Sequence, residues 1–282
     1  MYTIEYPQQN KLYDISKFYD IYHELYLKIW GDYNNLAFHM GYFDQTIRTH
    51  EESLLKMNQV VFDIAKIKQN DLVLDAGCGV GGSAIWLAKS KGSRVMGISL
   101  VENEIELAKK FAKENNVNNL TNFKVMEMTN TNFDNKTFNV IMTIESLCYV
   151  INKSNFLREA FRILQQDGRL IVADYFSKDE ISKEERNYIE QINETSLIHL
   201  CSQNQFKNTL KSNGFRNIQL YDLTRNVKKS YENGINKLSL LLTKTTDPFL
   251  KKVIEEEKDR NILEYFCMNN QILNYGLIYA EK

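Results

Sequence analysis

Residues 72–82 read Leu-Val-Leu-Asp-Ala-Gly-Cys-Gly-Val-Gly-Gly, an apolar run that ends in an acid and then breaks into glycines. The segment Leu72 to Leu74 is typical of a buried parallel strand, and residues 83–90, Ser-Ala-Ile-Trp-Leu-Ala-Lys-Ser, indicate the helix that follows. Glycine allows backbone angles that a Cβ would forbid, and it lets a ligand lie directly against the main chain. Such a ligand would face the free amide groups of a helix N-terminus. The stretch therefore predicts a strand, a ligand-binding turn and a helix.

The glycines alone do not identify the ligand, because Gly77-x-Gly79-x-x-Gly82 also fits the dinucleotide fingerprint. A nicotinamide or flavin site requires an acid at the end of the second strand, about twenty residues further on, to bind the ribose. The second expected strand, 94–98, is followed by Ser99, and the acid precedes the first glycine as Asp75. A nicotinamide oxidoreductase is therefore disfavoured, and a turn that binds nothing would not need so many glycines.

The stretch Leu-Asp-Ala-Gly-Cys-Gly at 74–79, followed by two further glycines, resembles the first motif of the class I S-adenosylmethionine-dependent methyltransferases. In that family the glycine turn receives the methionine half of the cofactor. The resemblance implies that Asp75, Gly77, Cys78 and Gly79 lie at S-adenosyl-L-methionine, and at S-adenosyl-L-homocysteine after transfer. It also implies an α/β fold, a Rossmann-like class I methyltransferase sheet with helices on both faces.

Composition indicates a protein that acts on small molecules. The 282 residues are 43% hydrophobic and 25% charged, with a net charge of -1, so no basic surface for nucleic acid is indicated. No apolar run reaches the eighteen or so residues of a membrane span, and the first residues are polar, without a signal-like core. The four cysteines are far apart and form no Cys-x-x-Cys, which favours cytoplasmic thiols over disulfides or zinc.

Strands and helices alternate from Leu74 to Phe176, which predicts a parallel sheet with ligands at the carboxyl ends of its strands. The expected strands are 72–75, 94–98, 122–126, 138–144, 169–176, 216–222 and 272–281. The expected helices are 83–90, 102–115, 153–165 and 203–213, with helical insertions at about 178–200 and 226–260.

Residues 1–60 are expected to form a helical N-terminal cap on a methyltransferase domain of residues 61–282. The first 43 residues are rich in aromatic side chains, and Phe18, Tyr22 and Tyr26 fall on one face of a helix. These rings can simply pack the cap onto the sheet. Together they also suit a cap over an apolar acceptor, and aromatic faces can stabilise a cationic intermediate. The acceptor site is expected between this cap and the strand ends, with the insertion at 226–260 as its other wall.

Further cofactor contacts follow from the family resemblance. Many class I methyltransferases carry an acid where Ser99 stands, and a subgroup resembling tocopherol methyltransferases and cyclopropane synthases takes the ribose with a Gln five residues later. Here that later residue is Glu104, which could instead be a solvated acid at a helix start. Leu100 adjoins Ser99 at the same turn. Glu127 and Met128, after the third strand, correspond to the residues that bind adenine.

Catalysis is expected at Thr-Ile-Glu-Ser-Leu-Cys-Tyr-Val, residues 143–150, which follow the fourth strand. Methyl transfer is an in-line displacement, so the protein has to align the reactants, exclude water and remove a proton. A carboxylate against an apolar wall has a raised pKa and can act as that base, which makes Glu145 the candidate. Glu145 could alternatively bind the methionine amine. His39 and Tyr149 are further candidates, and no histidines have metal-ligand spacing.

From about residue 70 to 175 the chain resembles tocopherol, sterol and geranyl diphosphate C-methyltransferases. The Glu-Ser-x-x-Tyr-Val segment at 145–150 and Tyr-Asp-Leu-Thr at 221–224 are closest to the geranyl diphosphate enzyme, in which the matching glutamate is the base. Cyclopropane synthases carry Glu-His where Cys148 and Tyr149 stand, which speaks against their bicarbonate-assisted chemistry. The terpenoid enzyme has two asparagines at Thr143 and Ile144, so diphosphate and Mg²⁺ recognition is not implied.

The sequence thus predicts a cytoplasmic S-adenosylmethionine-dependent methyltransferase that acts on a small, largely apolar metabolite. C-methylation of an isoprenoid-like alkene is favoured, with O- or N-methylation of a small metabolite as the alternative. A nicotinamide oxidoreductase and a non-catalytic cofactor-binding protein are the less favoured readings. No metal, nucleic acid or membrane span is expected, and a homo-oligomer is compatible with the chain.

Overall fold

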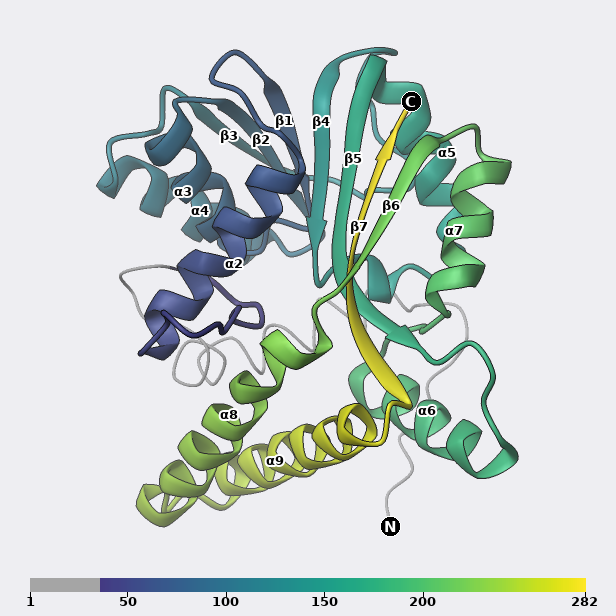
Figure 1. The fold of residues 1–282 in the computed structure, drawn as a ribbon. Helices are drawn as coiled ribbons and strands as arrows, with labels where there is room; N and C mark the ends of the chain where they lie inside the picture. Colours follow the sequence, from purple (N-terminus) through teal and green to yellow (C-terminus); the bar gives the residue numbers. More distant parts are fainter. Residues whose placement is uncertain (1–35) are drawn as a thin grey trace.

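The computed structural model describes residues 36–282 and shows a seven-stranded sheet at the centre of the molecule (Figure 1). Its order is β3-β2-β1-β4-β5-β7-β6. The strands are β1 (Leu72–Ala76), β2 (Arg94–Ser99), β3 (Thr121–Val125), β4 (Phe138–Ile144), β5 (Leu164–Ser177), β6 (Arg216–Asp222) and β7 (Leu273–Glu281). All seven strands that the sequence predicts are present.

The segment from Leu74 to Phe176 forms the parallel part of the sheet, as predicted, and the complete sheet is mixed. Strands β1 to β5 pair in parallel, whereas β7 is antiparallel to both β5 and β6. The chain enters β7 from helix α9, which lies beyond the carboxyl ends of the parallel strands, and it therefore runs back through the sheet (Figure 1). Strand β5 begins at Leu164, five residues earlier than expected, because Leu164 pairs with Phe138 ahead of a register shift.

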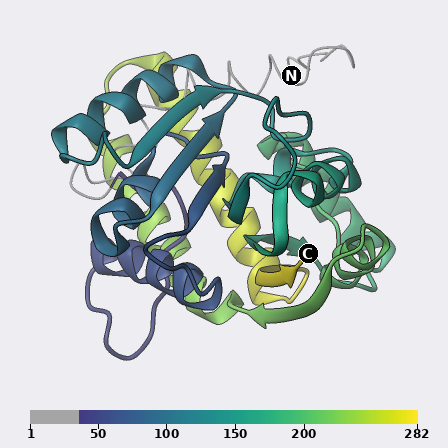
Figure 2. The same cartoon turned by 90° about the horizontal axis from the view of Figure 1, so that it is seen from above.

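Helices cover both faces of the sheet, as predicted (Figure 2). One face carries α2 (His50–Ile64), α3 (Gly82–Lys91) and α4 (Glu102–Glu114), whose side chains share one buried cluster. The other face carries α5 (Lys153–Ile163) and α7 (Gln203–Ser212), whose apolar side chains form a second cluster. Between these two layers, the carboxyl ends of the parallel strands form the edge of the sheet at which the candidate active site lies.

Three further helices lie beyond the carboxyl ends of the strands (Figure 1). Helix α6 (Lys183–Ser196) occupies the first expected insertion. The second insertion is longer than expected and contains two helices, α8 (Thr224–Lys244) and α9 (Pro248–Asn269). The division falls at Asp247, whose side chain caps α9, and Pro248 occupies the first turn, where its missing N–H costs nothing.

The expected cap is described only from residue 36 onward. Helix α2 begins with a capping box between Thr49 and Glu52 and runs through residue 60, the expected end of the cap. Phe38 and Tyr42 pack against the main core, whereas the aromatic residues before 36, including Phe18, Tyr22 and Tyr26, lie outside the described residues. Within residues 36–282 no helix is long and apolar enough to cross a membrane.

Candidate active site

A cavity of about 1140 Å³ runs along the carboxyl ends of β1, β2, β3 and β4. All twelve residues singled out in the sequence line this one cavity, although the chain separates them by up to 110 positions. They are His39, Asp75, Gly77, Cys78, Gly79, Ser99, Leu100, Glu104, Glu127, Met128, Glu145 and Tyr149. The volume exceeds that of a typical small-ligand pocket, so it can hold a cofactor and a second molecule.

The glycine turn between β1 and α3 adopts the backbone that glycine favours. Gly77 and Gly79 have φ values of 89° and 51°, and both line the cavity. A Cβ on Gly77 would lie 2.3 Å from the Ser146 side chain, whose hydroxyl donates to the Gly77 carbonyl at 3.0 Å. The hydrogen bond from Ser146 therefore holds the glycine turn close to the residues that follow β4. A side chain at position 77 would fill the space between them.

Asp75 is the acid that precedes the glycines, and it is 3% exposed. Its Oδ2 has no hydrogen-bond partner in the structure, and burial raises the pKa of the carboxyl to about 7. An ammonium group in the adjoining cavity would supply the missing partner and favour the ionised acid. The turn and its acid therefore fit the amino-acid end of S-adenosylmethionine.

Glu104 points inward from the first turn of α4. It is 5% exposed, and its Oε2 accepts a hydrogen bond from the Ser99 hydroxyl at 2.7 Å. Its other oxygen, Oε1, lies beside Gly79, 3.9 Å from an ideal Cβ position. The alternative of a solvated helix-start acid is therefore wrong for Glu104, whereas the neighbouring Glu102 is exposed. Ser99 and Glu104 together present oxygen atoms to the cavity, which suits two ribose hydroxyls.

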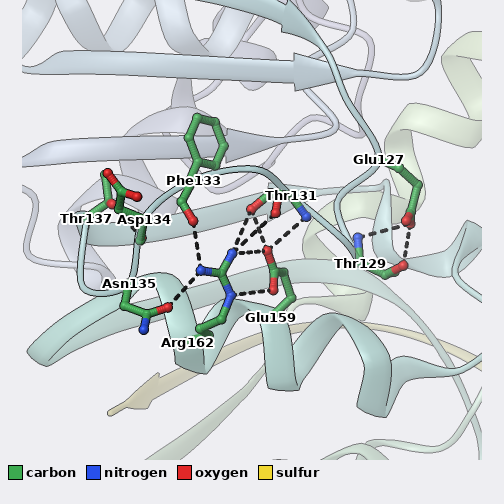
Figure 3. A network of polar contacts seen from close by, with 9 residues as sticks. All are labelled: Glu127, Thr129, Thr131, Phe133, Asp134, Asn135, Thr137, Glu159 and Arg162. Atoms are coloured by element: carbon green, nitrogen blue, oxygen red, sulfur yellow. Dashed lines mark hydrogen bonds and ion pairs between the residues drawn. The ribbon is translucent and has the colours of Figure 1, made fainter.

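Glu127 and Met128 follow β3 at the far end of the cavity. Glu127 Oε1 accepts from both the amide and the hydroxyl of Thr129, which orients the carboxylate (Figure 3). The Met128 side chain reaches back toward Gly77, within 3.3 Å of an ideal Cβ there. Both residues line the cavity, so the adenine contact expected of them stays a prediction that this position allows.

Helix α5 fixes the loop that carries these residues. Arg162 donates to the carbonyl of Phe133 at 2.7 Å and to the side chains of Asn135 and Glu159 (Figure 3). Glu159 in turn accepts from the amide of Thr131 at 2.9 Å. Because a charged pair binds several loop groups at once, the segment after Thr129 is tied to the folded core.

Glu145 follows β4 with a φ of 50°, a backbone angle that a residue with a Cβ rarely adopts. Its Oε1 accepts from the Met40 amide at 2.7 Å and from the Tyr275 hydroxyl at 2.8 Å. Its Oε2 accepts from the Tyr175 hydroxyl at 3.1 Å. Burial nevertheless raises the pKa of Glu145 to about 8, because desolvation outweighs these hydrogen bonds. The side chain is thus held in one orientation, and it changes protonation state at a pH slightly above neutral.

Two other catalytic candidates flank Glu145. His39 is 5% exposed, its Nδ1 lies 3.0 Å from the Met40 carbonyl, and burial lowers its pKa. A neutral imidazole of lowered pKa is a weaker base at pH 7 than the Glu145 carboxylate. Tyr149 ends a short 3₁₀ turn, Leu147–Tyr149, and lines both cavities that Glu145 lines.

A second cavity of about 110 Å³ adjoins the large one at Glu145. Glu145 lines both cavities, together with Phe38, His39, Tyr149 and Ile198. The remaining lining of the small cavity is more polar and includes Tyr175, Ser196, Glu257, Arg260, Asn261 and Glu264. Glu145 therefore borders both the large cavity and a smaller, more polar one.

The wall opposite the glycine turn differs from the expected one. Residues 193–195 and 197–199, at the end of α6 and in the loop after it, line the large cavity, with Leu197 and Ile198 as apolar contacts. Helix α9 of the second insertion contributes only to the small cavity, through Glu257, Arg260, Asn261 and Glu264. The insertion at 226–260 is thus not a wall of the large cavity within the described chain; the first insertion takes that place.

Sequence reasoning missed the groups that hold Glu145. Tyr175 and Tyr275 are 30 and 130 residues away, and their rings meet edge to face at 5.2 Å between centroids. Neither residue belongs to a local motif, so no signal in the sequence marked them. Ser146 was inside the motif at 143–150 but received no role there. In the described part of the chain, no group of three or more His, Cys, Asp or Glu residues is arranged to bind a metal ion.

Comparisons with known proteins agree with this geometry. A family profile described as "Methyltransferase domain" matches residues 67–214, just over half of the chain. The chain belongs to this methyltransferase domain family, which confirms the family expected from the glycine turn.

Two relatives and one solved structure illustrate the similarity. 27-O-demethylrifamycin SV methyltransferase from Amycolatopsis mediterranei is 30% identical over 162 residues, 57% of this chain and 58% of that protein. Chloroplastic tocopherol O-methyltransferase from Arabidopsis thaliana is 27% identical over 230 residues, 76% of this chain and 66% of that protein. The matched regions thus span less than two thirds of these relatives. Geranyl diphosphate C-methyltransferase from Streptomyces coelicolor A3(2) superimposes with a TM-score of 0.77 at 19% identity, over 98% of this chain and 99% of that chain, and confirms the fold.

Proposed function

We propose that the protein is an S-adenosylmethionine-dependent methyltransferase that methylates a small, largely apolar metabolite, with Glu145 as the general base. The observation that carries the proposal is the single cavity that joins the glycine turn to Glu145. The cofactor supplies an electrophilic methyl group on a sulfonium. One side of the cavity presents polar groups that are complementary to the amino-acid, ribose and adenine parts of the cofactor. These groups are the unpartnered Asp75 oxygen, the inward Glu104 side chain and the loop at Glu127.

The remaining lining suits an apolar acceptor. Ile144, Tyr149, Val150, Ile151, Leu197 and Ile198 surround the space next to Glu145. These side chains exclude water and hold the acceptor close to the donor, which supplies much of the rate enhancement in a displacement on carbon. Glu145 then removes the proton that the acceptor loses, at either Oε1 or Oε2.

C-methylation of an isoprenoid-like alkene remains our favoured reaction. It would form a cation beside the Phe38 and Tyr149 rings, whose faces attract positive charge, and Glu145 would remove a proton from it. Sterol and geranyl diphosphate C-methyltransferases among the relatives and structural neighbours support this choice. O- or N-methylation is the alternative, supported by the tocopherol and norajmaline enzymes. The cytoplasmic location and any homo-oligomer stay predictions from the sequence.

Two measurements test the proposal. Calorimetry should show binding of S-adenosylhomocysteine and none of NAD. Methyl-labelled cofactor, incubated with a panel of prenyl alcohols, sterols and phenols, should then transfer label to at least one apolar acceptor. Binding of NAD without binding of S-adenosylhomocysteine would contradict the proposal, and label found only in polar or charged acceptors would overturn the assigned acceptor class.

A further inference from the structure

Next to the small cavity at Glu145 lies a set of neighbouring polar groups that the chemistry above does not use. The Tyr175 hydroxyl donates to Glu145 Oε2 at 3.1 Å, and Tyr175 also interacts with Tyr231. Tyr231, 0% exposed, donates to Glu264 Oε2 at 2.9 Å. Glu264 Oε1 accepts from the Ser196 hydroxyl at 3.1 Å. Hydroxyl groups can both donate and accept, so this set can pass a proton from end to end.

We propose that the proton taken up by Glu145 leaves the acceptor site through the hydroxyls of Tyr175 and Tyr231 to Glu264 on α9. The inference rests on the proposed function, because it assumes that Glu145 receives a proton during methyl transfer. For each methyl group gained, the acceptor loses one proton, and the electron pair of the broken bond stays on the acceptor. Glu145 passes that proton to the Tyr175 oxygen, while the protons of Tyr175 and Tyr231 each move one oxygen along.

The end point of the path is suited to hold the proton and then release it. Burial raises the pKa of Glu264 to about 7, close to that of Glu145 at about 8, so transfer between them is nearly balanced. Glu264 is only half-buried, and it can pass the proton on to solvent. Asn261 Oδ1, also at the small cavity, has no hydrogen-bond partner in the structure, which makes water a suitable partner there.

Several charged and titratable groups face Glu264 and set its proton affinity. Glu257 raises its pKa and Arg260 lowers it, both from α9 itself. The groups from other elements are Tyr231 of α8, Ser196 of α6 and Tyr175 of β5, while Glu264 in turn raises the pKa of Cys267. Glu145 also lines the large cavity and can take the proton from the acceptor directly. The relay then carries the proton away from the acceptor, so that no water has to reach the reacting atoms.

The test compares Glu264→Gln and Tyr231→Phe with Tyr265→Phe. Tyr265 is on the same helix as Glu264, and its hydroxyl donates to Glu232 at the surface, so it is a matched control. We expect kcat at pH 7 to fall about tenfold or more in the first two variants and to recover partly on addition of imidazole, a small proton acceptor. Cofactor affinity should stay within about twofold, and the control should match wild type.

Infrared spectroscopy provides a readout that does not depend on turnover. A pH titration of the wild type should show three carboxyl groups that lose their protons near neutral pH, those of Asp75, Glu145 and Glu264, and Glu264→Gln should remove one and shift that of Glu145. Unchanged kcat in both relay variants would overturn the relay. So would a loss of kcat that is equal at all pH values and unaffected by imidazole. If Glu145→Gln loses activity while Glu264→Gln does not, the relay alone fails; if Glu145→Gln keeps full activity, the assigned base fails first.

Discussion

At the scale of single residues, Glu145 combines three hydrogen bonds with a left-handed backbone and a raised pKa. A residue held in this backbone region costs free energy that the surrounding contacts must offset, and such residues cluster at functional sites. The donors come from Met40, Tyr175 and Tyr275, in three separate parts of the chain. The position of the carboxylate is therefore set by tertiary structure, and the chemistry expected of it can be tested by substitution.

Glu145→Gln should lower kcat by about 10²- to 10⁴-fold, the usual contribution of a general base. The amide keeps the shape of the side chain but cannot take up the proton, so cofactor affinity should change little. Steady-state kinetics and calorimetry on the same variant provide both numbers. If Glu145 instead binds the methionine amine, the Kd for the cofactor rises and kcat at saturation stays close to wild type.

The pH dependence of catalysis follows from the same group. Only ionised Glu145 can act as a base, so kcat/KM for the cofactor should rise with pH, with an inflection near pH 8 and a plateau above it. A bound sulfonium favours the carboxylate, so the inflection in kcat should lie at lower pH. A pH profile of Glu145→Gln provides the control and should lack this inflection. A wild-type profile that is flat between pH 6 and 9 would rule out this assignment.

Glu104 offers a test with a built-in control two residues away. Glu104→Ala removes a buried carboxylate that contacts Ser99 and faces the glycine turn, and it should weaken cofactor binding by about 1–3 kcal/mol. Glu102→Ala changes an exposed acid on the same first turn of α4 and should leave the affinity within about twofold. Equal effects from both variants in calorimetry would show that Glu104 does not contact the cofactor.

At the scale of elements, the turn between β1 and α3 can be tested by pairing two glycines with similar backbones. Gly77 and Gly92 have φ values of 89° and 69°, so alanine strains both positions, by about 1 kcal/mol for the backbone. An added Cβ meets Ser146 at 2.3 Å in the first case and only Gln69 at 3.5 Å in the second. Gly77→Ala should therefore abolish measurable cofactor binding, whereas Gly92→Ala lowers stability alone.

Thermal unfolding and calorimetry on the two proteins separate these effects. A folded Gly77→Ala protein with wild-type affinity would mean that the cofactor does not lie against this turn. A Gly92→Ala protein that loses affinity to the same extent would mean that strain in α3, rather than occupied space, weakens binding.

At the scale of the whole molecule, local patterns predicted the first half of the sheet more fully than the second. Strand β1, the glycine turn and α3 are continuous in sequence, so burial and glycine spacing are visible together. The reversed direction of β7 depends on where α9 ends in space, which no local pattern encodes. For the same reason the sequence indicated Glu145 but not Tyr275, which is 130 residues away, and it placed the acceptor wall on the wrong insertion.

The position of β7 between β5 and β6 has a consequence for biosynthesis. The ribosome makes β5 and β6 before β7, yet β6 is joined to the sheet only through β7, and β7 also supplies the Tyr275 hydroxyl to Glu145. Until residues 273–281 emerge, a nascent chain has an open edge at β5, and the proposed base Glu145 lacks one of its hydrogen bonds. A chain stopped after residue 270 should therefore be captured by chaperones or aggregate, as co-sedimentation would detect, and should have no residual activity. Recovery of that shortened chain as a soluble, active enzyme would contradict this view. Otherwise, the enzyme becomes active only after the ribosome has translated β7.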